Sequence, residues 1–301
     1  MKPDFPHVID ATMIANWRSC HHKLFRGYIE HWKPKGESIH LHAGAAFARG
    51  LEVTRRSFYE AGNNPESAIE NGMAALVTAY GSFECPEGSN KSLDRMMGAL
   101  DYYFHVWPLG VGASPHVFPS GRHGIEFSFA QPLPFAHPQT GDPIIYAGRS
   151  DMICDFAGGL YIEDDKTASQ LGASWSKQWD LRSQFTGYCW AAAEAGMDVN
   201  GILVRGVSIL KTKYDHAEAI TYRPRWQIAR WLVQVQHDLE AMVSAWRTDY
   251  WDYALDHACD EYGGCAFKQI CTSDAPDTWL PMYFERRRWN PLDRCEEAVE
   301  S

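Results

Sequence analysis

The sequence predicts an α/β protein with a mixed central sheet flanked by helices. Three observations favour this class: apolar residues follow helical spacing through the first third of the chain, strand-like alternation dominates residues 123–168, and a helix, two strands and a long amphipathic helix follow. A repeating βαβ array would alternate strands and helices throughout. The order found here therefore favours a mixed sheet.

The first part of the chain is expected to be helical. Residues 10–31 read as one helix, with Asp10 or Thr12 as its N-cap. Residues 40–61 have an apolar side at helical spacing, and Gly62 follows as a stop signal. Two further helices are expected at residues 66–82 and 91–107.

Three strands are then expected to form an antiparallel meander. Residues 137–142 (HPQTGD) supply the first turn, and Ala157-Gly158-Gly159 supplies the second. The strands are expected at residues 123–133, 143–156 and 159–168.

The second half of the chain completes the sheet and its helices. A helix is expected at residues 175–196, ended by Gly196, and it is followed by strands at 201–212 and 216–223. Residues 223–247 place apolar side chains at three- and four-residue spacing, which predicts a long amphipathic helix.

Composition limits the class of protein. The chain has 301 residues, of which 45% are hydrophobic and 22% charged, as in globular proteins. No run approaches the roughly 18 apolar residues of a membrane span, and the N-terminal segment has no signal-peptide core. We therefore expect a cytoplasmic protein without a membrane partner. The formal charge of −10 argues mildly against nucleic-acid binding, but a local basic groove is compatible with it.

Two carboxylates and a lysine are predicted to meet on the second and third strands. Asp151 lies late on one strand, and Asp164 and Lys166 lie across the hairpin on the next. Residues two apart share a face of a strand, so Glu163 and Asp165 point the other way. Converging carboxylates suit Mg²⁺ or Mn²⁺, and a neighbouring lysine can position water and stabilise charge on a phosphate. The alternative, a solvated hairpin edge, is disfavoured by the apolar strand around these acids.

The following helix carries a second polar signal. Gln184 and Tyr188 are four residues apart and therefore lie on one helix face. They could contact a nucleic-acid strand or the catalytic groups. Alternatively, Gln184 is exposed and Tyr188 belongs to the core.

Together these motifs resemble the RecB-like branch of the PD-(D/E)XK nucleases. The pattern of that branch is G-x-x-D, a hairpin, D-x-K-T and Q-x-x-x-Y on the next helix. This chain has GRSD at 148–151, DDKT at 164–167 and QFTGY at 184–188, and the resemblance covers about residues 10–275. It implies a restriction-endonuclease-like core.

The resemblance also implies roles for individual residues. Asp151 and Asp164 would bind the metal and Lys166 would be catalytic. Gln184 and Tyr188 would support the site.

Two further acids are implied less directly. Glu126 matches an acidic position that is frequent in the family. The family often has a metal-binding His four residues after a Gly on an early helix, whereas Gly44 is followed by Ala48 in this chain. Glu52, one turn later on the same face, is a candidate replacement ligand, and the alternative is an ordinary surface role. This departure leaves the metal count and full activity open.

Four cysteines predict a second metal centre. Cys259, Cys265 and Cys271 have equal spacings, and Cys20 lies far away on the first helix. Four thiolates can hold a [4Fe–4S] cluster, with zinc as the alternative and Cys295 as the alternative to Cys20. The arrangement is similar to the iron–sulfur subgroup of these nucleases, which includes AddB-like and CRISPR-associated exonuclease-like members. A phage-encoded origin is compatible with it.

The implied activity is metal-dependent hydrolysis of phosphodiester bonds in DNA. Exonuclease action with a single-strand preference, in recombination, repair or phage DNA processing, is expected. The expected partner is single-stranded DNA or duplex ends. Because no GxxxxGK[ST] motif is present, a helicase or recombinase would be a separate partner. The alternatives are a catalytically weak DNA-binding or recombination accessory protein that retains the fold, and a zinc-stabilised protein of unrelated function.

A single nuclease domain is expected over residues 1–275. The segments are a helical part (1–115), a sheet-containing catalytic core (116–255), a Cys-rich segment (256–275) and a C-terminal tail (276–301).

Overall fold

The computed structural model describes residues 3–36, 38–172, 174–255, 257–260 and 264–294. The chain forms two compact units. Unit 1 comprises Met1–Gly36, Ser128–Gly148 and Arg225–Ser301, and unit 2 comprises Glu37–Phe127 and Arg149–Pro224. Strands β4 (Ile125–Ala136) and β5 (Pro143–Phe156) run through both. The single nuclease domain expected over residues 1–275 stays a prediction.

Unit 2 is built on a mixed sheet. Strand β6 (Gly159–Ala168) pairs antiparallel with β5 and parallel with β7 (Gly201–Ile209), and β8 (Tyr214–Tyr222) pairs antiparallel with β7. The short β3 (Ser114–Pro115) and β4 pair with β5. The predicted mixed sheet is therefore confirmed. Strand β7 is buried along its whole length, as a strand between two neighbours should be.

A two-residue loop fixes the hairpin between β5 and β6. Phe156 pairs with Gly159, and the intervening Ala157 and Gly158 have φ angles of 48° and 78°. Positive φ at both loop positions matches the right-handed twist of the flanking strands. This turn sets the register that places Met152 opposite Glu163.

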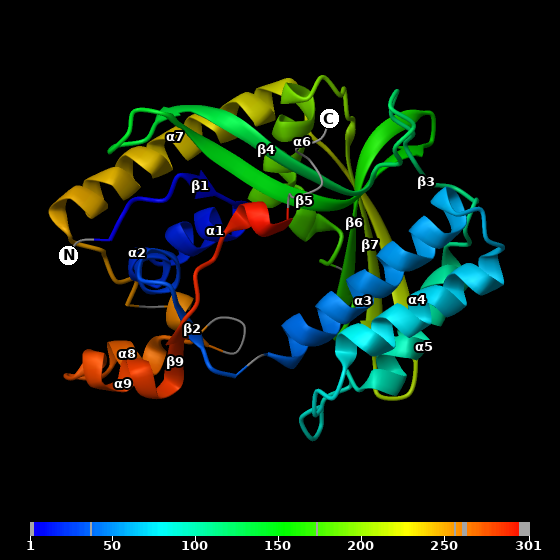
Figure 1. Cartoon of the computed structure of the whole chain (residues 1–301), viewed down its shortest axis with the longest axis horizontal. Helices are drawn as coiled ribbons and strands as arrows, with labels where there is room; N and C mark the ends of the chain where they lie inside the picture. The colour runs from blue at the N-terminus through cyan, green and yellow to red at the C-terminus, as the bar shows by residue number, and fades with distance from the viewer. Residues whose placement is uncertain (1–2, 37, 173, 256, 261–263, 295–301) are drawn as a thin grey trace. The chain divides into compact units, whose positions relative to one another are not determined.

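Three helices pack together in unit 2, as Figure 1 shows: α3 (Ile39–Arg55), α4 (Pro65–Tyr80) and α5 (Leu93–Val106). Helix α3 contacts β6 and α5 contacts β7, while α4 packs on α3 and α5. The π-helical turn η2 (Arg56–Glu60) continues α3. Helix α4 begins with Pro65 after Asn64, whose side chain accepts a hydrogen bond from Ser67 N–H. Gly72 permits the close approach of α3 and α4, because a Cβ there would lie 1.8 Å from Thr54 Oγ1. Buried Val207 and Ile209 of β7 complete this core.

The helix predicted over residues 175–196 is wrong in its first half. The chain forms only a short 3₁₀ turn, η3 (Lys177–Trp179), becomes extended at Arg182, and starts helix α6 (Ser183–Glu194) afterwards. Tertiary contacts outweigh helix propensity here, because Arg223 donates a 2.6 Å hydrogen bond to the Trp179 carbonyl. Helix α6 forms part of the crossover that joins β6 to the parallel strand β7.

Unit 1 contains the first and the longest helices. Helix α1 (Ala11–Ser19) is capped by Asp10, whose carboxylate accepts a 2.7 Å hydrogen bond from Met13 N–H. The single helix predicted over residues 10–31 is interrupted at Cys20, which is extended, and continues as α2 (His21–Leu24) and the π-helical turn η1 (Phe25–Ile29). Helix α7 (Arg225–Thr248) contacts α1, and β1 (Val8–Ile9) pairs parallel with β5. Within the described residues, no helix combines the length and apolar character of a membrane span.

The C-terminal part of unit 1 has more structure than the sequence predicts. The described part of the tail contains α9 (Pro276–Tyr283), β9 (Phe284–Arg286) and η6 (Pro291–Arg294), after η4 (His257–Cys259) and α8 (Lys268–Cys271). Strand β9 pairs antiparallel with β2 (Trp32–Pro34). A small core of Phe267, Ile270, Leu280 and Phe284 joins these elements. A three-residue strand whose partner lies some 250 positions away leaves no local signal in the sequence.

Candidate active site

Strands β5 and β6 bring the predicted carboxylates together. Because Met152 pairs with Glu163, the next position along the two strands sets Asp151 against Asp164. The Asp151 carboxylate accepts a 2.7 Å hydrogen bond from Asp165 N–H, which holds it against β6. The two acids and the lysine predicted to converge therefore occupy one place in unit 2.

Lys166 forms an ion pair with Asp164 on the same face of β6. The Asp164 side chain is 4% exposed and the Lys166 side chain 32%. Burial by itself lowers the pKa of Lys166, but the Asp164 and Asp151 carboxylates outweigh it and raise the pKa overall. Lys166 is therefore a fixed ammonium group, half-exposed beside a buried acid.

The acids at this place repel one another. Burial raises the pKa of Asp151 well above its ordinary value, and Asp164, Asp165 and Glu126 raise it further. Burial also raises the pKa of Asp164, while Lys166 opposes the shift. A cluster of carboxylates with raised pKa values is the electrostatic setting in which a cation is stabilising.

Glu126 joins this cluster from strand β4. Its backbone has a φ of 52°, in the left-handed region that non-glycine residues rarely adopt. Such a conformation costs about 1–3 kcal/mol and is often found where a side chain is aimed at a functional site. Burial raises the pKa of Glu126 to about 7, with Arg149, 2.7 Å away, lowering it and Glu52 raising it.

Glu52 reaches the same group of acids from α3. Its carboxylate forms ion pairs with Arg49 at 2.7 Å and Arg56 at 3.1 Å, and its charge acts on Glu126. Ala48, at the position of the family's His, lies one turn earlier on the same helix. The acid is therefore half-buried within reach of the cluster, and its role as a ligand stays a prediction.

The helical pair predicted from the sequence is joined by a hydrogen bond. Gln184 Nε2 donates to Tyr188 Oη at 2.8 Å, with Tyr188 buried and Gln184 half-buried. Arg182, directly before α6, acts electrostatically on both Asp164 and Lys166, so the start of α6 lies near that pair. Arg182 is exposed and adds a positive charge to this end of the site.

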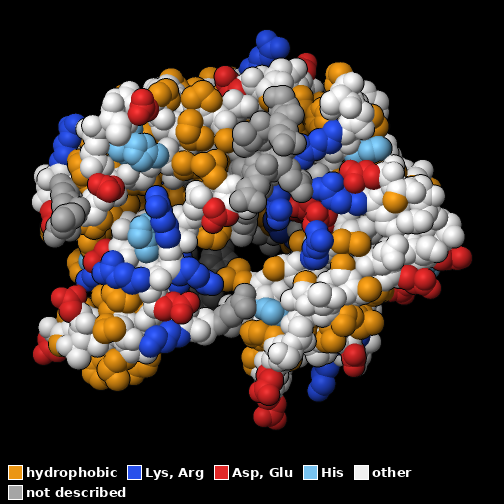
Figure 2. Space-filling model, in the orientation of Figure 1, with side chains coloured by type: hydrophobic (Ala, Val, Ile, Leu, Met, Phe, Trp, Pro, Cys, Tyr) orange, Lys and Arg blue, Asp and Glu red, His pale blue; other side chains and the backbone are white. Residues whose placement is uncertain are grey.

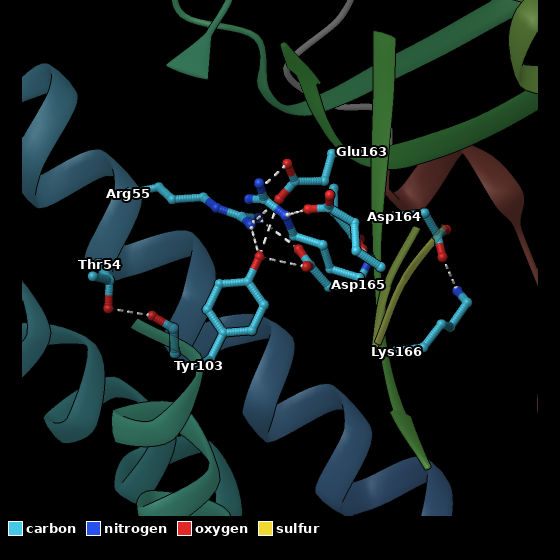
Figure 3. A network of polar contacts seen from close by, with 11 residues as sticks. Thr54, Arg55, Tyr103, Glu163, Asp164, Asp165 and Lys166 are labelled. Carbon is cyan, nitrogen blue, oxygen red and sulfur yellow. Dashed lines mark hydrogen bonds and ion pairs between the residues drawn. The ribbon is translucent and has the colours of Figure 1, made fainter. Parts of the chain in front are cut away.

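A buried ion network lies on the opposite face of β6, as Figure 3 shows. Arg55 of α3 pairs with Glu163 at 2.5 Å and Asp165 at 2.8 Å, and the Tyr103 hydroxyl of α5 is 2.7 Å from Asp165 Oδ1. Arg205 of β7 lies 3.2 Å from Glu163. The acids of this network were expected to point away from the site. Their cationic partners could not be identified from sequence, because α3 and β7 are far away along the chain.

The side chains at this site are of the chemical type that binds a hard divalent cation. Asp151, Asp164 and Glu126 offer carboxylate oxygens, which Mg²⁺ and Mn²⁺ prefer, and their mutual repulsion would be relieved by a cation. Each carboxylate instead has a nitrogen partner. Asp151 accepts a hydrogen bond from Asp165 N–H, Asp164 pairs with Lys166, and Glu126 pairs with Arg149. In the described part of the chain, no three His, Cys, Asp or Glu side chains are already arranged around a metal position.

Unit 1 gathers the four cysteines predicted as cluster ligands. Cys20 lies at the break between α1 and α2, Cys259 ends η4, Cys265 lies three residues before α8, and Cys271 is the last residue of α8. The pKa of the Cys271 thiol is raised to about 11, first by burial and then by Cys265, Cys20 and Cys259. Cys265, Cys20 and Cys259 therefore each lie within electrostatic reach of Cys271, although no three of these thiols in the described residues are already arranged around a metal position. The alternative ligand Cys295 lies outside the described residues.

Comparisons with known proteins address the whole chain. The model of the PD-(D/E)XK nuclease superfamily matches residues 12–272. A crystal structure from Eubacterium rectale, named as that of a candidate exonuclease, aligns with a TM-score of 0.50 and 11% identity over 84% of this chain and 87% of its own. The structure named SSO0001 aligns with a TM-score of 0.29 and 13% identity over 65% of this chain and 74% of its own. No curated protein matches the sequence. The family match spans most of the chain, so the chain belongs to the PD-(D/E)XK nuclease superfamily.

Proposed function

We propose that the protein is a Mg²⁺- or Mn²⁺-dependent deoxyribonuclease that digests DNA from its ends and prefers single strands. The observation that carries this proposal is the meeting of Asp151, Asp164 and Lys166 across the β5–β6 hairpin. Membership of the superfamily supports phosphodiester hydrolysis, and similarity to a candidate exonuclease supports end-directed action.

In this proposal each residue has a separate task. Asp151 and Asp164 would hold the cation, with Glu126 and Glu52 as further oxygen donors. A divalent cation at such a site supplies Lewis-acid polarisation of the phosphoryl oxygen. Lys166 presents a permanent ammonium group that can orient the attacking water and offset charge on the phosphate. The hydrogen-bonded Gln184 and Tyr188 would support the site from α6.

Cleavage of end-labelled DNA tests the proposal directly. Asp164→Ala and Lys166→Ala should each abolish Mg²⁺- or Mn²⁺-dependent cleavage. The matched control is Asp155→Ala, which removes an exposed carboxylate from the same strand as Asp151 and should cleave like the wild type. Closed circular, duplex and single-stranded DNA and RNA should be compared. Equal cleavage of linear and closed circular DNA would refute end-directed action.

A catalytically weak accessory role is the second candidate. It is favoured by Ala48 at the position of the family's His and by the cationic partners of Asp164, Glu126 and Glu52. Equal, negligible cleavage by the wild type, Asp164→Ala and Lys166→Ala, with DNA binding retained, would establish this second role. Under either proposed function, the protein would act with a separate helicase or recombinase.

We also propose that Cys20, Cys259, Cys265 and Cys271 hold a [4Fe–4S] cluster with a structural role. The influence of Cys20, Cys259 and Cys265 on the Cys271 thiol supports a shared site. Protein purified without oxygen should be brown and contain iron. Cys271→Ser should lose that iron, whereas Cys85→Ser, which changes a half-buried thiol of unit 2, should retain it. Zinc in place of iron would favour the alternative metal.

A further inference from the structure

The β2–β9 ribbon of unit 1 concentrates positive charge on an acidic protein. We define the ribbon as residues 31–36 and 284–289, which are joined by the β2–β9 pairs and by Lys35 N–H to Tyr283 O and Arg287 N–H to His31 O. Five of its side chains are Lys or Arg and only Glu285 is acidic, a balance of +4, whereas the whole chain carries −10. The five are Lys33, Lys35, Arg286, Arg287 and Arg288. Figure 2 shows Lys and Arg gathered where Figure 1 places β2 and β9.

Four of these five cations are exposed, and none forms an ion pair with an acid in the described part of the chain. Lys35 and Arg286–Arg288 are exposed and Lys33 is half-buried. Among the ion pairs found between described residues, none involves any of the five. Lys35 donates instead to the Pro281 carbonyl at 2.8 Å, and Arg286 to the Glu30 carbonyl at 3.0 Å.

The cations also lie close enough to repel one another. Burial lowers the pKa of Lys33 to about 8 and Arg287 adds to the shift, while Asp10 opposes it. Burial, Arg288, Lys33 and Arg286 all lower the pKa of His31. Five cations against the single acid Glu285 leave the ribbon with excess positive charge, which is stabilised by contact with a polyanion.

Aromatic rings are interleaved with the charges. Arg286 lies over the Trp32 ring at 4.5 Å, and Lys33 lies over the Tyr28 ring at 3.8 Å. Trp279 and Tyr283, in the helix that leads into β9, are stacked and partly exposed. Basic groups that follow a phosphate backbone beside rings on which bases can stack are typical of surfaces for single-stranded nucleic acid.

We infer that the β2–β9 ribbon binds the phosphate backbone of single-stranded nucleic acid, outside the carboxylate cluster of unit 2. The inference rests on the proposed nuclease function and adds to it a binding surface that carries no catalytic group. Phosphate contacts are independent of base sequence, so the ribbon would hold substrates of any sequence.

The test measures binding separately from cleavage. Asp164→Ala protein is titrated against a fluorescein-labelled oligodeoxythymidylate, followed by anisotropy at several salt concentrations. Arg287→Gln/Arg288→Gln in that background removes two phosphate contacts. At about 0.1 M salt the Kd should rise roughly 30-fold, and the slope of log K against log salt should fall by about 1.4. Arg225→Gln/Arg230→Gln, which removes the same charge from exposed positions on α7, should change neither.

Further outcomes are decisive. Arg287→Lys/Arg288→Lys should bind like the wild type, because charge and not shape is required. In protein with Asp164 intact, the ribbon variant should raise KM and leave kcat unchanged. An unchanged salt slope, equal losses in the α7 control, or binding of anionic vesicles without binding of the oligonucleotide would overturn the inference. Failure of cleavage by the wild type would refute the nuclease proposal while leaving these binding measurements intact.

Discussion

Replacing Arg55 by methionine tests the buried network that holds β6. Arg55 is 5% exposed and is the shared cation of Glu163 and Asp165, both almost completely buried. Removing one partner of a buried ion pair costs about 3–5 kcal/mol, because the remaining charge stays desolvated. Arg205 still lies 3.2 Å from Glu163, so we expect the lower end, about 3 kcal/mol. For a unit of this size the melting temperature should fall by roughly 6–12 °C.

The pH dependence of this loss has a defined sign. Burial already raises the pKa of Glu163, and removing Arg55, which lowers it, raises it further. A carboxyl whose pKa is raised by folding loses stability as pH increases from its unfolded pKa through its folded pKa. The deficit of the Arg55→Met variant should therefore be larger at roughly pH 8 than at roughly pH 5.

Differential scanning fluorimetry at both pH values measures the effect. The control is Arg49→Met on the same helix, where the arginine is 53% exposed and its ion pair with Glu52 should contribute less than about 1 kcal/mol. Adding Glu163→Gln to Arg55→Met should restore part of the stability, since it removes one uncompensated charge. An Arg55→Met variant that melts within about 2 °C of the wild type near pH 8, or a deficit that is independent of pH, would refute this reasoning.

Three further outcomes are expected. Mg²⁺ at a hundredfold excess over its Kd should stabilise the protein by about 2.7 kcal/mol. At a fixed Mg²⁺ concentration the stabilisation should be larger near pH 8 than near pH 5, because Asp151 and Glu126 must lose protons before they bind the cation. Equal thermal shifts at both pH values would contradict the proposed metal site. Gly206→Ala should lower the free energy of unfolding by about 1–3 kcal/mol, because the new Cβ would lie 2.4 Å from a Trp175 ring carbon. The control Gly172→Ala, whose Cβ would meet nothing within 4 Å, should leave it unchanged when both are measured by chemical denaturation. Tyr188→Phe removes the hydrogen bond from Gln184 and should cost about 0.5–1.5 kcal/mol; unchanged melting would mean that this bond contributes nothing to folding.

Local sequence signals predicted most of the secondary structure and the meeting of Asp151, Asp164 and Lys166. The hairpin at Ala157-Gly158 and the alternation along β6 were sufficient to separate Asp164 and Lys166 from Glu163 and Asp165. Both signals are local, since a turn fixes register and a strand has a two-residue period. The mixed sheet followed from the order of the elements.

Long-range contacts account for what the sequence could not predict. The extended residue Cys20 divides one predicted helix, and the residues before Ser183 are held by a bond from Arg223. The partners of Glu163 come from α3, α5 and β7, which no local pattern connects. Strand β9 is defined by its pairing with β2 at the other end of the sequence.

The alternation along β6 restricts how this part of the protein can change in length. Inserting one residue between the hairpin and Glu163 would rotate every later side chain to the opposite face, so the acids now joined to Arg55 would exchange places with Asp164 and Lys166. Two inserted residues would restore the original faces. We therefore expect natural variants of this hairpin to differ by even numbers of residues, since odd changes would bury the Lys166 ammonium group and expose the ion network.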